Sequence, residues 1–243
     1  MKGLDTLTLA GFDIVHTFDT AALAETPGFA MLAGDARLGI LIGNTRALWP
    51  PFTAALHDPN WSDRFQLAAQ QGSEAPRSEG PAGAAPVLAT ERDPLDRYTE
   101  RVIDAAFPGA RRYYGHRRYD EGFVPLQRLA AATGLGALAP THLVIHPIYG
   151  PWFALRAVVV MEGEPPLRTP IPKPCHCDAS CSASFARARQ SKDWRDWLAV
   201  RDSCTLGAWR YGDEQVHYHY SQLTHPPGEI SSYRPVPVGD SVR

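Results

Sequence analysis

The sequence has no hydrophobic run that approaches the length of a membrane span, so we expect no membrane-spanning helix and no membrane partner. Its first residues, MKGLDTLTLAGFDIV, contain one lysine and are interrupted by Asp5 and Asp13, a pattern that does not resemble a secretory signal. These two absences predict a cytoplasmic protein.

The sequence also lacks an excess of charge of either sign. The chain has 24 Lys and Arg against 26 Asp and Glu, which gives a net charge of −2. General nucleic-acid binders normally carry a basic surplus, so a nucleic-acid partner is not expected. One exception is ARRYYGHRRY, from Ala110 to Tyr119. This segment is typical of an edge strand with solvated arginines, and an RNA-binding patch is the less favoured alternative.

Several catalytic signatures are missing as well. The sequence contains no Gly-rich phosphate loop that ends in Lys and Ser, and no Gly-x-Gly-x-x-Gly after a predicted strand. It also has no Ser-His-Asp order. Hydrolases, kinases and nicotinamide-dependent enzymes are therefore disfavoured.

What the chain does contain predicts one domain. Its length of 243 residues is sufficient to bury a substantial core, and no internal repeat divides it. Residues 70–91 are rich in Gly, Ala, Pro, Ser and Glu without apolar periodicity, which predicts a mobile insertion over about residues 60–91. We expect a single domain over residues 1–243, with a Cys-containing segment at about residues 172–205.

The ordered segments mix strands and helices. RLGILIGNT predicts a buried strand, whereas TRALWPPFTAAL looks like a helix start that two prolines interrupt. A helix capped by Asp93 and Pro94 is expected next, followed by another from about Pro125 to Thr133 that Gly134 stops. SKDWRDWLAVRDSC and GDEQVHYHYSQL predict two more helices. Because βαβ alternation is absent, the expected fold class is an α+β sandwich.

Four cysteines form the candidate metal site. Three lie in PCHCDASC, and all four are Cys175, Cys177, Cys181 and Cys204. Soft thiolates select iron–sulfur clusters or zinc, and of these we favour iron–sulfur. The usual Cys-x2-Cys spacing is absent, so reduced, partly buried thiols in a loop are the alternative.

The histidines are ambiguous. His217 and His219 lie two positions apart on a predicted helix, so we expect them to point to different faces and to have structural roles. His146 precedes Pro147, which favours an extended backbone. This side chain either donates a hydrogen bond into a pocket or closes a turn.

The stretch THLVIHPIYGPWFALRAVVVMEG, from Thr141 to Gly163, predicts two strands around a long aromatic turn. Alternation would place Leu155 with Ala157 on one face, and Arg156 on the other. A guanidinium on a buried sheet face requires a partner to offset its desolvation. Arg156 is therefore either an anion clamp or the partner of a neighbouring Asp or Glu.

These motifs resemble a known family. IHPIYGPWFALRAVVVMEGE, DWRDWLAVRDSCT and RYGDEQVHYHYSQLTHPP resemble the cobalamin-processing protein of methylmalonic aciduria and homocystinuria type C. That family is known as cyanocobalamin reductase or alkylcobalamin dealkylase. AATGLG, the His-Pro-x-Tyr-Gly-Pro-Trp corner and the cysteines after it also resemble epoxyqueuosine reductase, a cobalamin and iron–sulfur enzyme.

The resemblance implies a flavin-reductase-like (nitroreductase-type) α+β fold with a corrinoid cavity. The family removes the upper axial ligand of cobalamin, by reductive decyanation with a reduced flavin (FMN or FAD) or by alkyl transfer to glutathione. By position, Arg156 and Arg201 match the arginines that bind the glutathione carboxylates, and they are the expected catalytic residues. The expected corrinoid-binding residues are Leu126, Gln127, Val144, Ile145, His146, Tyr149, Gly150, Trp152 and Leu155.

The chain departs from the family pattern at four positions. Pro151 replaces a Gly, Ala131 a His, Ile230 an Arg and Val144 a Cys. Cobalamin binding is therefore better supported than glutathione-dependent dealkylation. A corrinoid iron–sulfur reductase and a non-catalytic cobalamin carrier are the alternatives. A downstream cobalamin-dependent enzyme or a second copy of the chain is the expected macromolecular partner.

Overall fold

The computed structural model describes residues 2–23, 26, 28–58, 93–120, 122–167, 180–191 and 193–221. The expected insertion at 60–91 and the cysteines Cys175 and Cys177 lie outside the described residues. The helices are α1 (Lys2–Leu9), α2 (Trp49–His57), α4 (Pro94–Ala106), α5 (Leu126–Thr133), α6 (Ser180–Ala188), α7 (Trp194–Asp202) and α8 (Asp213–Ser221), with short 3-10 turns η1 (Thr20–Leu23), η2 (Ala30–Leu32) and η3 (Arg46–Leu48). The strands are β1 (Ile14–Asp19), β2 (Leu38–Asn44), β3 (Arg111–Tyr114), β4 (Arg118–Tyr119), β5 (Gly122–Phe123), β6 (Ala137–Leu138), β7 (Val144–Ile145) and β8 (Ala154–Met161).

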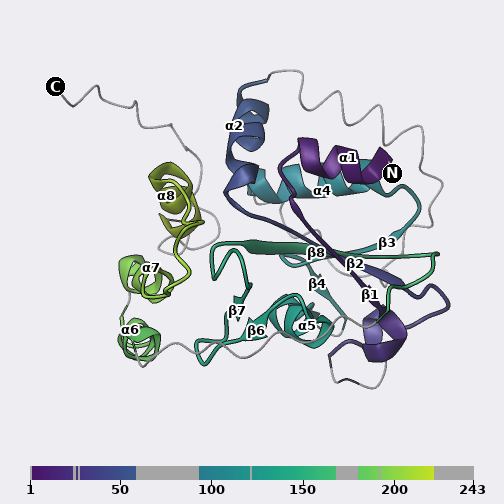
Figure 1. Ribbon diagram of the computed structural model, residues 1–243. Coiled ribbons are helices and arrows are strands. Elements are labelled where there is room, and N and C mark those ends of the chain that lie inside the picture. Colours follow the sequence, from purple (N-terminus) through teal and green to yellow (C-terminus); the bar gives the residue numbers. More distant parts are fainter. Residues whose placement is uncertain are drawn as a thin grey trace, which may run out of the picture.

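An antiparallel sheet lies at the centre of the fold, with the strand order β1-β2-β8-β3 (Figure 1). Strand β2 is buried over almost its whole length, as its uninterrupted apolar run predicts. Such a run occurs where both faces of a sheet are covered. The remaining strands form two short pairs, β4 with β5 and β6 with β7.

Helices cover both faces of this sheet. On one face, Leu7 of α1, Phe52 of α2 and Val102 of α4 belong to one apolar cluster with Ile42 and Val159. On the other face, α5 packs through the cluster that contains Leu129, Leu41 and Val158. The expected α+β class is confirmed, and the central sheet lies between two helical layers (Figure 1).

Helix α4 forms as its sequence predicts. Asp93 is the N-cap and accepts a hydrogen bond from the Leu95 N–H at 2.7 Å, with Pro94 in the first turn. Helix α5 ends at Gly134, whose φ of 86° favours glycine. The two helices predicted before and after residue 205 are α7 and α8, so these four of the five helical predictions are confirmed.

The prediction that prolines interrupt the helix after residue 45 is wrong. Helix α2 begins at Trp49, and Pro50 and Pro51 occupy its first turn. The first N–H groups of a helix have no intrahelical acceptor, so proline costs nothing there.

Two strands form between Thr141 and Gly163, as predicted, but they do not pair with each other as a hairpin. Strand β7 pairs with β6, whereas β8 lies between β2 and β3 in the central sheet. The segment between β7 and β8 closes on itself through paired backbone hydrogen bonds of His146 and Gly150, both 2.9 Å. Strand β2 offers β8 a long, buried partner, which the two-residue strand β7 does not provide.

A β-bulge overturns the predicted face assignment in β8. Ile42 pairs with Ala157, but the next residue, Gly43, pairs with Leu155, which leaves Arg156 as an extra residue. As a result, Leu155 packs against the cluster on the α5 face, whereas Ala157 belongs to the cluster on the α4 face. Strict alternation had placed these two residues together.

The Arg- and Tyr-rich segment contains the edge strand β3, as predicted. Its arginines are not simply solvated, however. Arg112 pairs with Asp104 at 2.8 Å, and Arg117 pairs with the buried Glu100 of α4. Burial alone would raise the pKa of Glu100, but hydrogen bonds from His116 and Arg117 outweigh it and lower that pKa to about 2.

Helices α6, α7 and α8 stack beside the start of β8 (Figure 1). Trp152, Tyr211, Val216 and Tyr220 form a separate apolar cluster there. None of the helices in the described part of the chain has the length and apolar character needed to cross a membrane.

Candidate functional site

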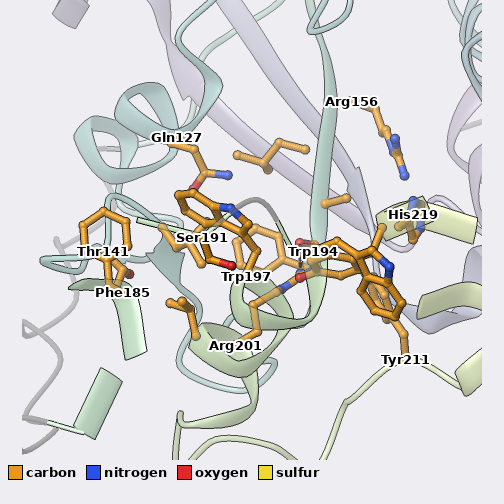
Figure 2. Close-up of a pocket in the computed structure, with 16 residues that line it drawn as sticks. Gln127, Thr141, Arg156, Phe185, Ser191, Trp194, Trp197, Arg201, Tyr211 and His219 are labelled. Carbon is orange, nitrogen blue, oxygen red and sulfur yellow. Dashed lines mark hydrogen bonds between the residues drawn. The ribbon is translucent and has the colours of Figure 1, made fainter. Parts of the chain in front are cut away.

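A cavity of about 970 Å³ lies between the α5–β8 layer and helices α6 to α8 (Figure 2). Elements distant in sequence form its walls, because β8 starts next to α7 and α8. The lining residues are Gln127, Thr141, Leu143, Phe153, Ala154, Leu155, Arg156, Phe185, Ser191, Trp194, Trp197, Val200, Arg201, Tyr211, His219 and Tyr220.

Aromatic side chains dominate one wall. Phe185 of α6 packs edge-on against Trp197 of α7, with ring centroids 6.1 Å apart. One helical turn before Trp197, Trp194 packs against Tyr220 of α8 at 5.9 Å. Such walls exclude water from a bound ligand and supply apolar contact area.

Arg156 lies on the opposite wall, in the bulge of β8. Its Nε donates a hydrogen bond to Asn44 Oδ1 at 2.8 Å. Its Nη2 is buried and has no hydrogen-bond partner among the described residues. Burial lowers the pKa of Arg156, and the more distant carboxylates of Asp96 and Asp93 offset this only in part.

The predicted alternatives for Arg156 were an anion clamp and an ion pair. In the described part of the chain, no carboxylate forms an ion pair with Arg156, which donates instead to the neutral amide of Asn44. A buried guanidinium with an unused donor favours the binding of an anion.

Arg201 has a different environment. Its Nε donates to the backbone oxygen of Pro151 at 3.1 Å, and its Nη2 donates to the oxygens of Pro151 and Phe153. The guanidinium also lies over the rings of Trp152 and Tyr211, 4.7 and 5.1 Å from their centroids. Arg201 therefore ties α7 to the segment that leads into β8.

His219 of α8 also faces the cavity, beside Arg156 (Figure 2). Burial, together with the charges of Arg156 and Arg201, lowers its pKa to about 3. The ring is therefore neutral at physiological pH. Like Arg156 Nη2, His219 Nε2 is buried without a hydrogen-bond partner among the described residues.

Gln127 joins the cavity from α5. Its Oε1 accepts the backbone N–H of Val144 at 2.7 Å, so its amide nitrogen is the atom it can offer to a ligand. A second cavity of about 500 Å³ shares Gln127, Leu155 and Arg156 with the first. Leu126 lines this second cavity, so these four predicted residues lie around two adjoining spaces.

Other predicted corrinoid-binding residues lie behind the cavity wall, outside its lining set. Val144 and Ile145 are buried in two different apolar clusters. His146 closes the turn, because its Nδ1 accepts the N–H groups of Ile148 and Tyr149 at 3.1 and 3.3 Å. We predicted that His146 either donates into a pocket or closes a turn, and in the structure it closes the turn.

The other residues of the aromatic corner hold the backbone in place. Tyr149 stacks on His146 with centroids 4.5 Å apart. Gly150 has a φ of 58°, and an added Cβ would lie 2.3 Å from the Leu206 oxygen, so a larger residue does not fit. Trp152 is fully buried beneath Arg201. The corner thus holds the start of β8 in place.

The cysteine prediction falls partly outside the described residues. Cys181 lies in α6 and Cys204 after α7, and both thiols are buried. No group of three or more His, Cys, Asp or Glu side chains suited to a metal occurs in the described part of the chain. A cluster would therefore depend on Cys175 and Cys177, and the four-cysteine site stays a prediction.

Sequence reasoning missed the aromatic wall and underrated His219. Phe185 lies on α6, a helix that was not predicted, and Trp194 and Trp197 were noted only as part of a motif. The alternation of His and Tyr in VHYHY was the available signal for His219. As predicted, His217 and His219 face different ways, and His217 is exposed.

Comparisons with known proteins agree with the motifs. No family model matches the chain. The cyanocobalamin reductase / alkylcobalamin dealkylase of Bos taurus is 37% identical over 75 residues, which are 30% of this chain and 26% of that protein. The resemblance to this family is confirmed. The match nevertheless spans only about a quarter of the relative.

A solved structure shows the fold. A C. elegans B12-trafficking protein, CblC, described as a human MMACHC homologue, has a TM-score of 0.57 at 16% identity, over 95% of both chains. Epoxyqueuosine reductase from Bacillus subtilis has a TM-score of 0.44 at 14% identity, over 93% of this chain and 67% of the other. The chain therefore has a fold similar to that of CblC.

Proposed function

We propose that the chain binds a corrinoid in the cavity between β8 and helices α6 to α8, and that it removes the upper axial ligand. The observation that carries this proposal is the cavity itself. Its volume of about 970 Å³ lies at the upper end of the range for small-molecule sites, and its wall contains an unused guanidinium donor. The names of the Bos taurus relative and the C. elegans structure support a corrinoid as the ligand.

The chain's own residues bind and orient the substrate. Trp194, Trp197 and Phe153 supply apolar surface to the ring and exclude water. Gln127 donates its amide N–H groups to carbonyl oxygens of the corrinoid side chains, since its own oxygen is already bonded. Arg156 Nη2 binds an anionic group, either on the corrinoid or on a co-substrate.

Ligand removal needs a second reactant. A cyanide ligand leaves when the cobalt accepts an electron, whereas an alkyl ligand passes to a thiolate and its bonding electron pair stays on cobalt. We propose a flavin-reductase-like, nitroreductase-type fold in which reduced FMN or FAD would supply the electron for decyanation, or a thiol such as glutathione would accept the alkyl group on its sulfur. The residues around the cavity favour a thiol, because the anion site that we propose at Arg156 suits its carboxylates, while the described residues show no feature specific to a flavin.

Visible spectroscopy of the purified protein with cyanocobalamin tests the proposal. We expect a shift to the base-off spectrum on binding, then loss of the cyanide ligand when a reductant or glutathione is added. Arg156→Gln should weaken both effects, whereas Arg195→Gln, a change on the exposed face of α7, should leave them intact. A wild-type spectrum that stays base-on with every reductant would overturn the proposal.

The same experiment separates the alternatives. A carrier shows the base-off shift but keeps the upper ligand under all conditions. An iron–sulfur reductase contains iron and sulfide after anaerobic purification, and Cys204→Ser, checked for folding by far-UV dichroism, then lowers the iron content. Unchanged iron in that variant would place Cys204 outside the cluster.

A further inference from the structure

Three polar atoms of residues that line the cavity have no hydrogen-bond partner among the described residues, although all three are buried. They are Arg156 Nη2, His219 Nε2 and the Tyr211 hydroxyl. Buried polar atoms in folded proteins are almost always bonded, so this unpartnered set calls for a physical reason. Figure 2 shows the Arg156 guanidinium directed towards the ring of His219, and the charge of Arg156 lowers the pKa of His219.

The neighbours of His219 fix its ring without using Nε2. Tyr211 lies 5.5 Å from the imidazole, and Tyr218 lies 5.8 Å away at an interplanar angle of 80°. The other cation that affects the ring, Arg201, already donates to the backbone oxygens of Pro151 and Phe153. One charged donor, one neutral ring and the hydroxyl of Tyr211 therefore remain for a ligand.

We propose that His219 is a specificity-determining residue, which donates a hydrogen bond from Nε2 to the same anionic group that Arg156 Nη2 binds. This inference rests on the proposed function. A neutral imidazole carries one proton and can place it on Nε2 when an acceptor is present. Arg156 contributes the charged donor of the subsite, and the charge of Arg201 also acts on it, so the group that fits is an anion with at least two oxygen acceptors.

Carboxylates and phosphodiesters share this chemistry. A carboxylate occurs on a thiol co-substrate such as glutathione, and a phosphodiester occurs in the nucleotide loop of cobalamin. The subsite thus discriminates between ligands with an anion at this position and their neutral analogues, because a neutral analogue leaves the guanidinium donor unpaired in a buried place.

Two pairs of probes distinguish the sources. Glutathione is compared with its diethyl ester, and cobalamin is compared with cobinamide, which lacks the nucleotide loop. Each probe is titrated against wild type, His219→Leu and His219→Gln, with His217→Leu as the matched control on the exposed face of α8. A Gln side chain keeps an N–H donor close to the position of Nε2.

We expect His219→Leu to weaken binding of the anionic member of one pair by at least about tenfold, as loss of a hydrogen bond to a charged group predicts. Binding of the neutral member should change less than about twofold. His219→Gln should retain most of the discrimination, and His217→Leu all of it. The pair that responds identifies the source of the anion.

Equal weakening of both members would overturn the inference, because it would mean a packing role for His219. Unchanged binding of both would overturn it too. If His219→Leu does not fold, imidazole ¹⁵N spectra of the wild type replace it, and the anionic probe alone should shift the Nε2 resonance. A wild type that binds no probe means that the proposed function fails; normal wild-type binding without discrimination means that only this inference fails.

Discussion

Arg156 and Arg201 line one cavity, and they differ in what their guanidinium groups already bind. Arg201 donates to two backbone oxygens and lies over two aromatic rings. Arg156 donates to one amide and keeps a buried Nη2 without a partner among the described residues. The motifs alone gave both arginines the same role. In the structure, Arg201 holds the backbone before β8, whereas Arg156 keeps the donor that we propose for ligand binding.

The largest expected effect is on ligand binding in Arg156→Gln. Truncation of a desolvated charge that binds an anion should cost about 2–5 kcal/mol of binding free energy. The free energy of unfolding should change by less than about 1 kcal/mol, because removal of the buried charge offsets the lost bond to Asn44. A cobalamin and glutathione titration beside a thermal melt measures both.

The opposite result would reverse the comparison. If Arg156→Gln unfolds easily while its folded fraction binds normally, Arg156 is the structural residue of the two.

Arg201→Met should act mainly on stability. The change leaves the oxygens of Pro151 and Phe153 without their donor, and we expect a loss of about 3 kcal/mol in the free energy of unfolding. Urea denaturation measures this loss. Arg195→Met is the matched control on the same helix, since its exposed pair with Asp193 should contribute no more than about 0.5 kcal/mol. Equal stability of the two variants would contradict the supporting role.

The titration of His219 tests whether the charge of Arg156 acts on this part of the cavity. Its folded pKa of about 3 lies below the ordinary value of 6.5, so the unfolded chain binds more protons between these values. The free energy of unfolding therefore loses nothing to this ring above pH 6.5, and it decreases as the pH falls from 6.5 towards 3. After allowance for screening of this partly exposed ring, His219→Gln should remove about 2 kcal/mol of that pH dependence.

Denaturant melts of wild type and His219→Gln at several pH values between 3 and 7 measure the difference. Parallel curves would mean that the His219 ring titrates normally and that Arg156 does not act on it.

Asn44→Asp should have the smallest effect and should make Arg156 more like Arg201. A carboxylate at this position would accept from Arg156 Nε and compete with the anion of the ligand. We expect a loss of about 1 kcal/mol in the binding free energy of the anionic probe, with the neutral probe unaffected. Tighter binding of the anionic probe would contradict a charge-based role for Arg156.

Much of the fold was predictable where the signal is local. Asp93 with Pro94 predicted the start of α4, and Gly134 predicted the end of α5, because capping and φ preferences depend on neighbours in the chain. Strand pairing was not predictable in the same way. The apolar run of β8 suits any partner, and only the assembled sheet places it between β2 and β3.

The candidate site was predictable through motifs and not through spacing. Gln127, Leu155, Arg156 and Arg201 were singled out by resemblance, and the structure brings all four to one cavity. The bulge that exposes Arg156 to this cavity has no sequence signal, because it depends on the register of β2 against β8.

By itself, the sequence determined the helices of the described region that have strong caps, the buried character of β2 and β8, and the motifs that mark the site. These features depend on residues close together in the chain. The tertiary structure decided which polar groups of the cavity are already bonded. Arg156 lies on β8 and Arg201 on α7, and which of them keeps an unpartnered donor among the described residues depends on how these elements pack.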